Sequence, residues 1–194
     1  MSKKKKYVDI MIDIETLGKG PKAAILSIGG VVFDINTGDI KDTFYKAASL
    51  ESCLHEGMEV DSETILWWLS NDLQEVRVEI AKECGEEADD IMEVLCDLFD
   101  FIESHRKDGD AMRVWFKPPH FDAVIIESAF DLFYMELPWK YYELMDLRTL
   151  TKIYTGEKPE FQVEGNKHNA LYDATIQAKI CSHIWNRLRD KMEE

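Results

Sequence analysis

Two apolar, β-branched stretches stand close together near the N-terminus, and they constrain the fold more than any other part of the chain. They cover residues 7–14 and 23–35, and the tetrad Asn36-Thr37-Gly38-Asp39 separates the second from a third stretch at 40–45. Runs of this kind, bounded by Asn, Asp and Gly, are typical of strands joined in hairpins. We therefore predict that the chain begins with three antiparallel strands.

The remainder of the chain predicts helices that alternate with short strands. Asp61 or Ser62 can cap a helix that runs through Trp67 and Trp68, because their side chains accept hydrogen bonds from a first helical turn. Apolar periodicity predicts further helices at about 75–105, 121–133 and 169–192, and strands at 113–116 and 141–146. Antiparallel strands followed by alternating β and α elements indicate an α/β fold in which helices cover a mixed sheet.

A single domain accounts for the whole chain, residues 1–194. A domain of this size buries roughly 70% of the surface of its unfolded chain. Neither an internal repeat nor a linker rich in Pro, Gly or Ser divides the sequence. We interpret residues 1–6 as a flexible, Lys-rich N-terminus and residues 51–110 as an acidic helical insertion. The irregular stretch at 156–167 predicts a surface loop directly before His168.

The net charge of −15 comes from one part of the chain. Residues 51–110 hold 19 of the 38 acidic residues but 4 of the 23 basic ones, so the remaining residues carry equal numbers of both. The overall charge therefore does not exclude a polyanionic partner, although phosphate binding usually depends on Lys and Arg. The acidic segment is typical of a solvated helical face, with a partner-binding surface as the alternative.

The composition indicates a cytoplasmic protein without membrane contact. No apolar run approaches the roughly 18 residues of a membrane span, and the Lys-rich start is not followed by a signal-peptide core. The four cysteines lack the C-x-x-C pairs and Cys/His clusters of zinc sites, so we interpret them as reduced thiols. The sequence also contains neither a P-loop nor a Rossmann fingerprint.

Asp13 and Glu15 stand two residues apart at the end of the first apolar stretch. Side chains alternate along a strand, so both carboxylates leave the sheet on the same face. Two neighbouring anions are costly to bury, and a hard divalent cation such as Mg²⁺ or Mn²⁺ offsets their repulsion. An isolated D-x-E is also a common surface pattern, so its interpretation depends on the rest of the chain.

Two further motifs place acidic residues at the starts of predicted helices. Asp122 follows Phe121 where a helix is predicted to begin after a short strand. His168 stands five residues before Asp173, which lies near the start of the last predicted helix. Taken alone, Asp122 is typical of a helix cap and His168 of a loop histidine. Asp131 is predicted to lie on the other side of its helix and is a poorer candidate. The three motifs in this order and context are improbable by chance.

This combination of D-x-E, F-D and H-x-x-x-x-D resembles the DEDDh 3′-to-5′ exonucleases. The group contains ribonuclease T, oligoribonuclease and polymerase proofreading domains, and the chain looks most similar to phage exonuclease A-like and bacterial 3′-to-5′ exoribonuclease-like proteins. The resemblance implies a ribonuclease H-like fold with a five-stranded sheet of order 3-2-1-4-5, in a bacterial or phage-infected cell. The tyrosine of the DEDDy branch would stand at Asn169, so the histidine branch is favoured.

The resemblance also implies roles for individual residues. The implied ligands of two Mg²⁺ or Mn²⁺ ions are Asp13, Glu15, Asp122 and Asp173, and the implied general base is His168. The implied substrate-binding residues are Thr16, Leu17, Trp67, Phe121 and Asn169. The implied reaction hydrolyses phosphodiester bonds at the 3′ end of single-stranded nucleic acid, with DNA slightly favoured over RNA, and releases nucleoside 5′-monophosphates. A homodimer is compatible with the sequence, which does not determine the oligomeric state.

Several alternatives stay open at this point. Trp67 and Trp68 can both belong to the core, and Arg148 can be structural or approach the substrate. The stretch from Trp115 to His120 replaces the small residues of many relatives, and its two prolines and its bulk are expected to narrow the groove. The alternative functions are a nucleic-acid or polymerase-binding module with weak or no catalysis, and an aspartate-nucleophile phosphatase, which typically carries D-x-D.

Overall fold

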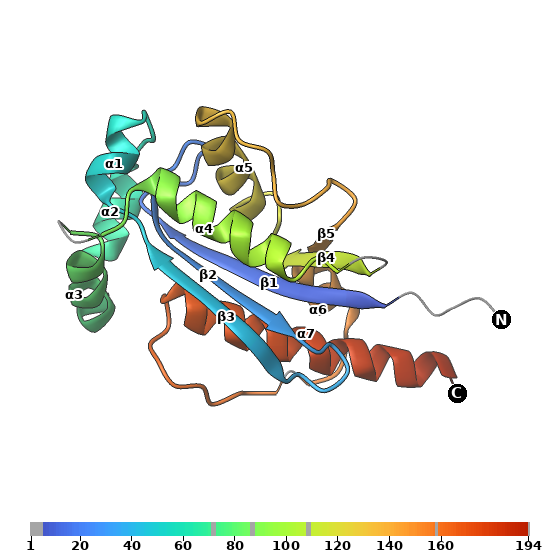
Figure 1. The fold of residues 1–194 in the computed structure, drawn as a ribbon. Coiled ribbons are helices and arrows are strands. Elements are labelled where there is room, and N and C mark those ends of the chain that lie inside the picture. The colour runs from blue at the N-terminus through green and yellow to red at the C-terminus, as the bar shows by residue number, and fades with distance from the viewer. Residues whose placement is uncertain (1–5, 71–72, 86–87, 108–109, 158, 194) are drawn as a thin grey trace.

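A computed structural model describes residues 6–70, 73–85, 88–107, 110–157 and 159–193. Its central sheet consists of β1 (Tyr7–Thr16), β2 (Ile25–Phe33), β3 (Ile40–Ala47), β4 (Ala111–Phe116) and β5 (Leu144–Asp146). β1 pairs antiparallel with β2 and parallel with β4, and β5 extends the parallel side. The strand order is β3-β2-β1-β4-β5, which confirms the predicted mixed sheet (Figure 1).

The helices surround this sheet. They are α1 (Leu50–His55), α2 (Ser62–Trp68), α3 (Gln74–Glu83), α4 (Ile91–Ser104), α5 (Asp122–Leu132), α6 (Leu147–Ile153) and α7 (Ala170–Glu193). Asp61 caps α2, since its side chain accepts hydrogen bonds from the N–H groups of Glu63 and Thr64. α1 and α6 are short helices that the sequence patterns did not predict.

The last strand is shorter than predicted. Residues 141–143 form a turn instead of extending β5, and the N–H of Glu143 closes this turn on the carbonyl of Lys140 at 2.8 Å. The side chain of Glu143 binds Arg106 with both oxygens, at 2.9 and 3.1 Å. This turn ends the regular strand, although the carbonyl of Glu143 still accepts a hydrogen bond from the N–H of Val114 at 2.8 Å. The local apolar pattern did not reveal the turn.

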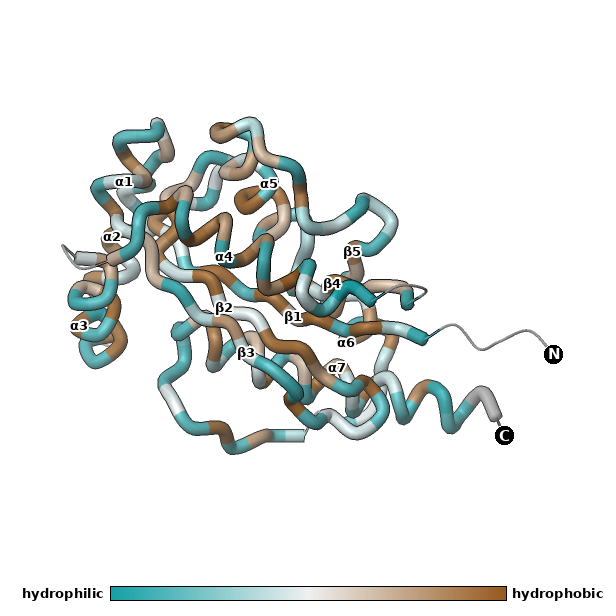
Figure 2. Tube along the Cα trace, viewed as in Figure 1, coloured by the Kyte–Doolittle hydropathy of each residue, from teal (hydrophilic) through white to brown (hydrophobic). Residues whose placement is uncertain are grey.

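Side chains of β1 alternate between the two faces of the sheet. Ile10, Ile12 and Ile14 pack into the larger hydrophobic core, which α4 and α5 cover. Met11 packs on the other face, against the small buried residues of α7. Figure 2 shows apolar residues concentrated along β1 and β2, between these helical layers. Asp13 and Glu15 share the face of Met11 and therefore point toward α7.

The segment from α1 to α4 lies between β3 and β4 and includes most of the predicted acidic insertion. Residues 1–5 of the predicted flexible N-terminus lie outside the described residues. Among the helices of the described ranges, none is long and apolar enough to cross a bilayer.

Candidate active site

Four carboxylates converge at one edge of the sheet. Asp13 and Glu15 lie near the end of β1, and Asp122 opens α5 soon after β4. Because β1 and β4 are parallel neighbours, their carboxyl ends lie at the same edge. Asp173 comes from the first turn of α7, which packs across β1 and β2. The four carboxylates line one cavity of about 550 Å³.

Small residues let the start of α7 lie close to the sheet. Gly29 of β2 faces the backbone of Ala170, and a β-carbon at position 29 would lie within 3.0 Å of that backbone. Asn169 caps the helix, since its Oδ1 accepts hydrogen bonds from the N–H groups of Leu171 at 3.1 Å and Tyr172 at 3.2 Å. The capped first turn of α7 thereby lies close to β2, the neighbour of the strand that carries Asp13 and Glu15.

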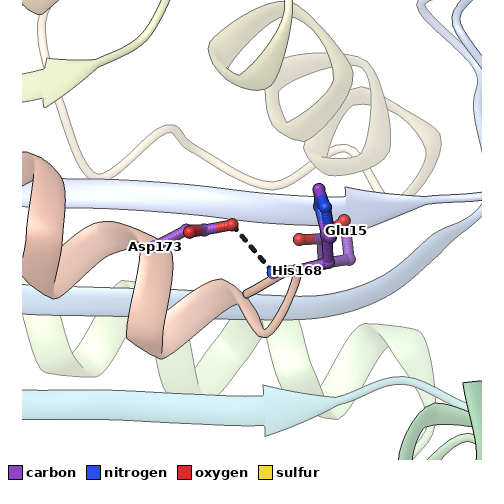
Figure 3. A group of neighbouring side chains, drawn as sticks. All are labelled: Glu15, His168 and Asp173. Atoms are coloured by element: carbon purple, nitrogen blue, oxygen red, sulfur yellow. Dashed lines mark hydrogen bonds between the residues drawn. The ribbon is translucent and has the colours of Figure 1, made fainter. Parts of the chain in front are cut away.

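The His168 ring lies between two acids and two tryptophans. His168 has a φ of 67°, in the left-handed region, and its backbone N–H donates to Asp173 Oδ2 at 3.1 Å. Ligand-type atoms of Glu15, His168 and Asp173 lie within 4.8 Å of one another (Figure 3). The ring also meets Trp67 and Trp68 edge-on, at centroid distances of 5.1 and 6.4 Å. α2 therefore forms one wall around the histidine.

Burial raises the pKa of all four carboxyl groups. It raises the pKa of Asp13 well above its usual range, and the charges of Asp122 and Asp173 raise it further. Burial and the neighbouring Asp13 do the same to the pKa of Glu15. Burial raises the pKa of Asp122 to about 7, against backbone N–H groups that lower it. Burial also raises the pKa of Asp173, although the N–H of His168 opposes the shift.

This donor set fits divalent cations that prefer oxygen ligands. Buried carboxylates that repel one another are stabilised in the ionised form by a cation placed among them. Lys117 and Arg148 line the same cavity, and both lower the pKa of Asp122. These two side chains supply positive charge at the rim, where a phosphate group would approach.

A second cavity, of about 510 Å³, adjoins the carboxylates. Glu15 and Phe121 line both cavities, and Thr16 and Trp67 line the second. Trp67 is 45% exposed, so part of its side chain is accessible to a ligand in this cavity. Trp68 also lines this cavity but is 5% exposed, and its Nε1 donates to the carbonyl of Thr16 at 3.0 Å. Trp68 therefore secures the end of β1.

Two of the predicted substrate-binding residues lie away from the cavity walls. Leu17 packs against two hydrophobic clusters and lines neither cavity. Asn169 lines neither cavity, and its side-chain oxygen is committed to capping α7.

The stretch from Trp115 to His120 divides between the cores and the cavity. Trp115 and Phe116 are 1% and 0% exposed, and they pack into the cores on opposite faces of the sheet. The alternation of side chains along β4 directs them there. Lys117, Pro118 and His120 line the cavity beside the carboxylates.

The structure adds Gln177 and Lys117 to the site, which the sequence patterns did not assign, and it places Arg148 there, for which they left two interpretations open. Gln177 of α7 donates a hydrogen bond from Nε2 to Asp13 Oδ1 at 2.6 Å. Lys117 and Arg148 line the carboxylate cavity. The position of Gln177, one helical turn after Asp173, is a signal that could have identified it, since residues four apart share a helix face.

Comparison with known proteins agrees with this geometry. Residues 8–185 match the protein family described as the 3′-5′ exoribonuclease Rv2179c-like domain. The chain is also 26% identical, over 161 residues, to an exodeoxyribonuclease of Enterobacteria phage T4. That alignment covers 73% of this chain and 69% of the phage protein.

Solved structures share the fold at low sequence identity. The nuclease domain of 3′hExo, a DEDDh family member bound to rAMP, superposes with a TM-score of 0.61 at 15% identity, covering 93% of this chain and 92% of that domain. E. coli exonuclease I in complex with a dT13 oligonucleotide gives a TM-score of 0.60 at 12% identity, covering 96% of this chain and 43% of exonuclease I. These likenesses confirm the predicted ribonuclease H-like fold. The chain therefore belongs to the 3′-5′ exoribonuclease Rv2179c-like family, and it is a 3′-to-5′ exonuclease.

Proposed function

We propose that this protein removes nucleoside 5′-monophosphates from the 3′ end of single-stranded nucleic acid, with DNA slightly favoured over RNA. The observation that carries the proposal is the convergence of four carboxylates, of which Asp122 is buried and the other three are half-buried, beside His168 at the end of β1. The phage T4 relative is named an exodeoxyribonuclease, which favours DNA. The family is described as exoribonuclease, which makes RNA the necessary comparison substrate.

The four carboxylates of Asp13, Glu15, Asp122 and Asp173 are proposed to hold two divalent cations, Mg²⁺ or Mn²⁺. When bound, such a pair stabilises the attacking and leaving oxygens of an in-line displacement. The raised pKa values support this role, because ionisation of all four acids in a buried site needs compensating positive charge.

The remaining residues are proposed to handle the proton and the terminal nucleotide. His168 takes a proton from the attacking water, and its contacts with Trp67 and Trp68 keep the ring beside Glu15. Thr16, Trp67 and Phe121 line the second cavity, where the terminal base and sugar would lie against aromatic and apolar surface. Leu17 and Asn169 support these residues through packing and helix capping.

A comparison of labelled substrates tests the proposed reaction. We expect mononucleotide release from 3′-labelled single strands of DNA and of RNA with the same sequence, a higher kcat/KM for DNA, and complete loss of activity in a chelator. Duplexes and 5′-labelled strands serve as controls for polarity and strandedness. Internal cleavage, or the absence of Mn²⁺-dependent release from every single strand, would contradict the proposal. A small phosphate monoester as the best substrate would favour a phosphatase instead.

Replacing His168 by Gln is expected to lower kcat by about 10²–10⁴-fold, which is the usual contribution of a positioned general base. The affinity for Mn²⁺, measured by calorimetry, is expected to stay close to that of the wild type, because the carboxylates remain. His183→Gln is a matched control, since His183 lies further along α7 and its ring contacts Tyr154. An unchanged kcat would exclude His168 as the base, and a parallel loss of Mn²⁺ binding would identify it as a ligand.

A further inference from the structure

We infer that Gln177 is a positioning residue of the active site, which holds the Asp13 carboxylate in the orientation needed to bind a divalent cation. The inference rests on the proposed function, in which Asp13 is a metal ligand. It is carried by the 2.6 Å hydrogen bond from Gln177 Nε2 to Asp13 Oδ1, which joins residues 164 positions apart. Such bonds to a ligating carboxylate restrict its rotation and direct its free oxygen.

The face of α7 explains why Gln177 reaches the strand. Asp173 and Gln177 are one helical turn apart and therefore lie on the same side of the helix. Ala174 and Ala178 are fully buried against the sheet, so the helix axis lies close to β1. At this separation the side chain of Gln177 is long enough to reach Asp13. An asparagine side chain is one methylene shorter and would not reach it.

The burial of Gln177 indicates a role beyond packing. The residue is 6% exposed, and its Oε1 has no hydrogen-bond partner among the described residues. With a cation bound, Asp13 is ionised and only accepts hydrogen bonds, so the amide presents its NH₂ group to Asp13. A buried amide oxygen without a partner is costly. The NH₂ group of Gln177 is thus hydrogen-bonded to Asp13, whereas its side-chain oxygen has no partner among the described residues.

Calorimetric titration with Mn²⁺, in the absence of nucleic acid, tests the inference. Gln177→Met keeps the length of the side chain but removes the donor, and it is expected to weaken Mn²⁺ binding by about 10–100-fold. Ser182→Ala is the matched control, because Ser182 is another buried polar residue of α7, at 4% exposure. We expect the control to bind Mn²⁺ like the wild type. Excess Mn²⁺ should restore much of the lost kcat of Gln177→Met.

Asp13→Asn in the same titration distinguishes the inference about Gln177 from the proposed ligand role of Asp13. If Asp13→Asn loses Mn²⁺ binding while a folded Gln177→Met retains wild-type affinity, the inference about Gln177 is wrong and the proposed metal site stands. If Asp13→Asn binds Mn²⁺ like the wild type, the proposed ligand role of Asp13 is wrong. Near-ultraviolet circular dichroism establishes folding. Should Gln177→Met not fold, Gln177→Asn carries the same expectation, because its amide cannot reach Asp13.

Discussion

Asp122→Asn is expected to abolish nuclease activity and, at the same time, to raise the melting temperature of the metal-free protein at pH 8. Removing a ligand of a catalytic cation forfeits several kcal/mol of transition-state stabilisation, which corresponds to a loss of at least about 10³-fold in kcat. The gain in stability has a separate cause. Burial raises the pKa of Asp122 to about 7 from its ordinary 3.8, so the ionised group opposes folding when no cation is bound.

The direction of the pKa shift of Asp122 determines the pH range in which the stability of the metal-free protein changes. The folded protein holds the Asp122 proton more tightly than the unfolded chain, so the metal-free wild type loses stability as pH rises from about 4 to about 7. At about 1.4 kcal/mol per pKa unit, the neutral asparagine recovers on the order of 2–4 kcal/mol at pH 8 and almost nothing at pH 4. For a protein of this size that gain corresponds to about 5–10 °C.

Calorimetric melting in a chelator, at pH 4 and pH 8, measures the effect. Asp131→Asn is the matched control, because Asp131 is an exposed aspartate of the same helix, and it should change neither stability nor activity appreciably. Adding Mg²⁺ should stabilise the wild type at pH 8 and should stabilise Asp122→Asn much less. If Asp122→Asn had a lower melting temperature than the wild type at pH 8 in chelator, the free-energy cost assigned to burying the ionised Asp122 would be wrong.

Gly29→Ala is expected to lower kcat/KM by about 100-fold or more and to destabilise the protein by roughly 3 kcal/mol. The added β-carbon would lie within 3.0 Å of the backbone of Ala170 and Leu171, where no flexible side chain can yield. Overpacking of this kind typically costs about 1–3 kcal/mol or more. The start of α7 must therefore move, and a displacement of about 1 Å at Asp173 and His168 is enough for a 100-fold loss.

The neighbouring glycine provides the control. A β-carbon on Gly30 would meet the side chains of Phe101 and Phe44 at 3.5 Å, which is ordinary van der Waals contact. Gly30→Ala should therefore retain activity and change stability by less than about 1 kcal/mol. Steady-state kinetics and thermal unfolding of Gly29→Ala and Gly30→Ala measure the expected changes in activity and stability. If Gly29→Ala kept wild-type kinetics, the close approach of α7 to β2 would not determine the geometry of the site.

Local rules made much of this protein predictable. The alternation of side chains along the first strand placed Asp13 and Glu15 on one face, and the antiparallel start of the sheet followed from apolar runs and a turn tetrad. Three short motifs resembled those of the DEDDh group, and this resemblance implied the strand order. The strand alternation and each single motif depend on residues that are close in sequence, so one chain is enough to read them.

Other features depend on which distant surfaces pack together. The bulk of Trp115 and Phe116 lies in the cores on opposite faces of the sheet, whereas Pro118 of the same stretch lines the carboxylate cavity. Trp68 of α2 donates a hydrogen bond to the carbonyl of Thr16 at the end of β1, 52 positions away in the sequence. No local pattern contains this partner.

The sequence by itself predicted which carboxylates act together, through strand alternation, helix starts and the resemblance of three motifs to those of a known family. Only the tertiary structure decided that all four line one cavity, that Gln177 holds Asp13, and that Gly29 admits α7 to the sheet. The physical reason is the separation along the sequence over which each effect acts. Alternation and capping act over a few residues, whereas desolvation and charge repulsion act on whatever the packed chain brings within a few ångströms.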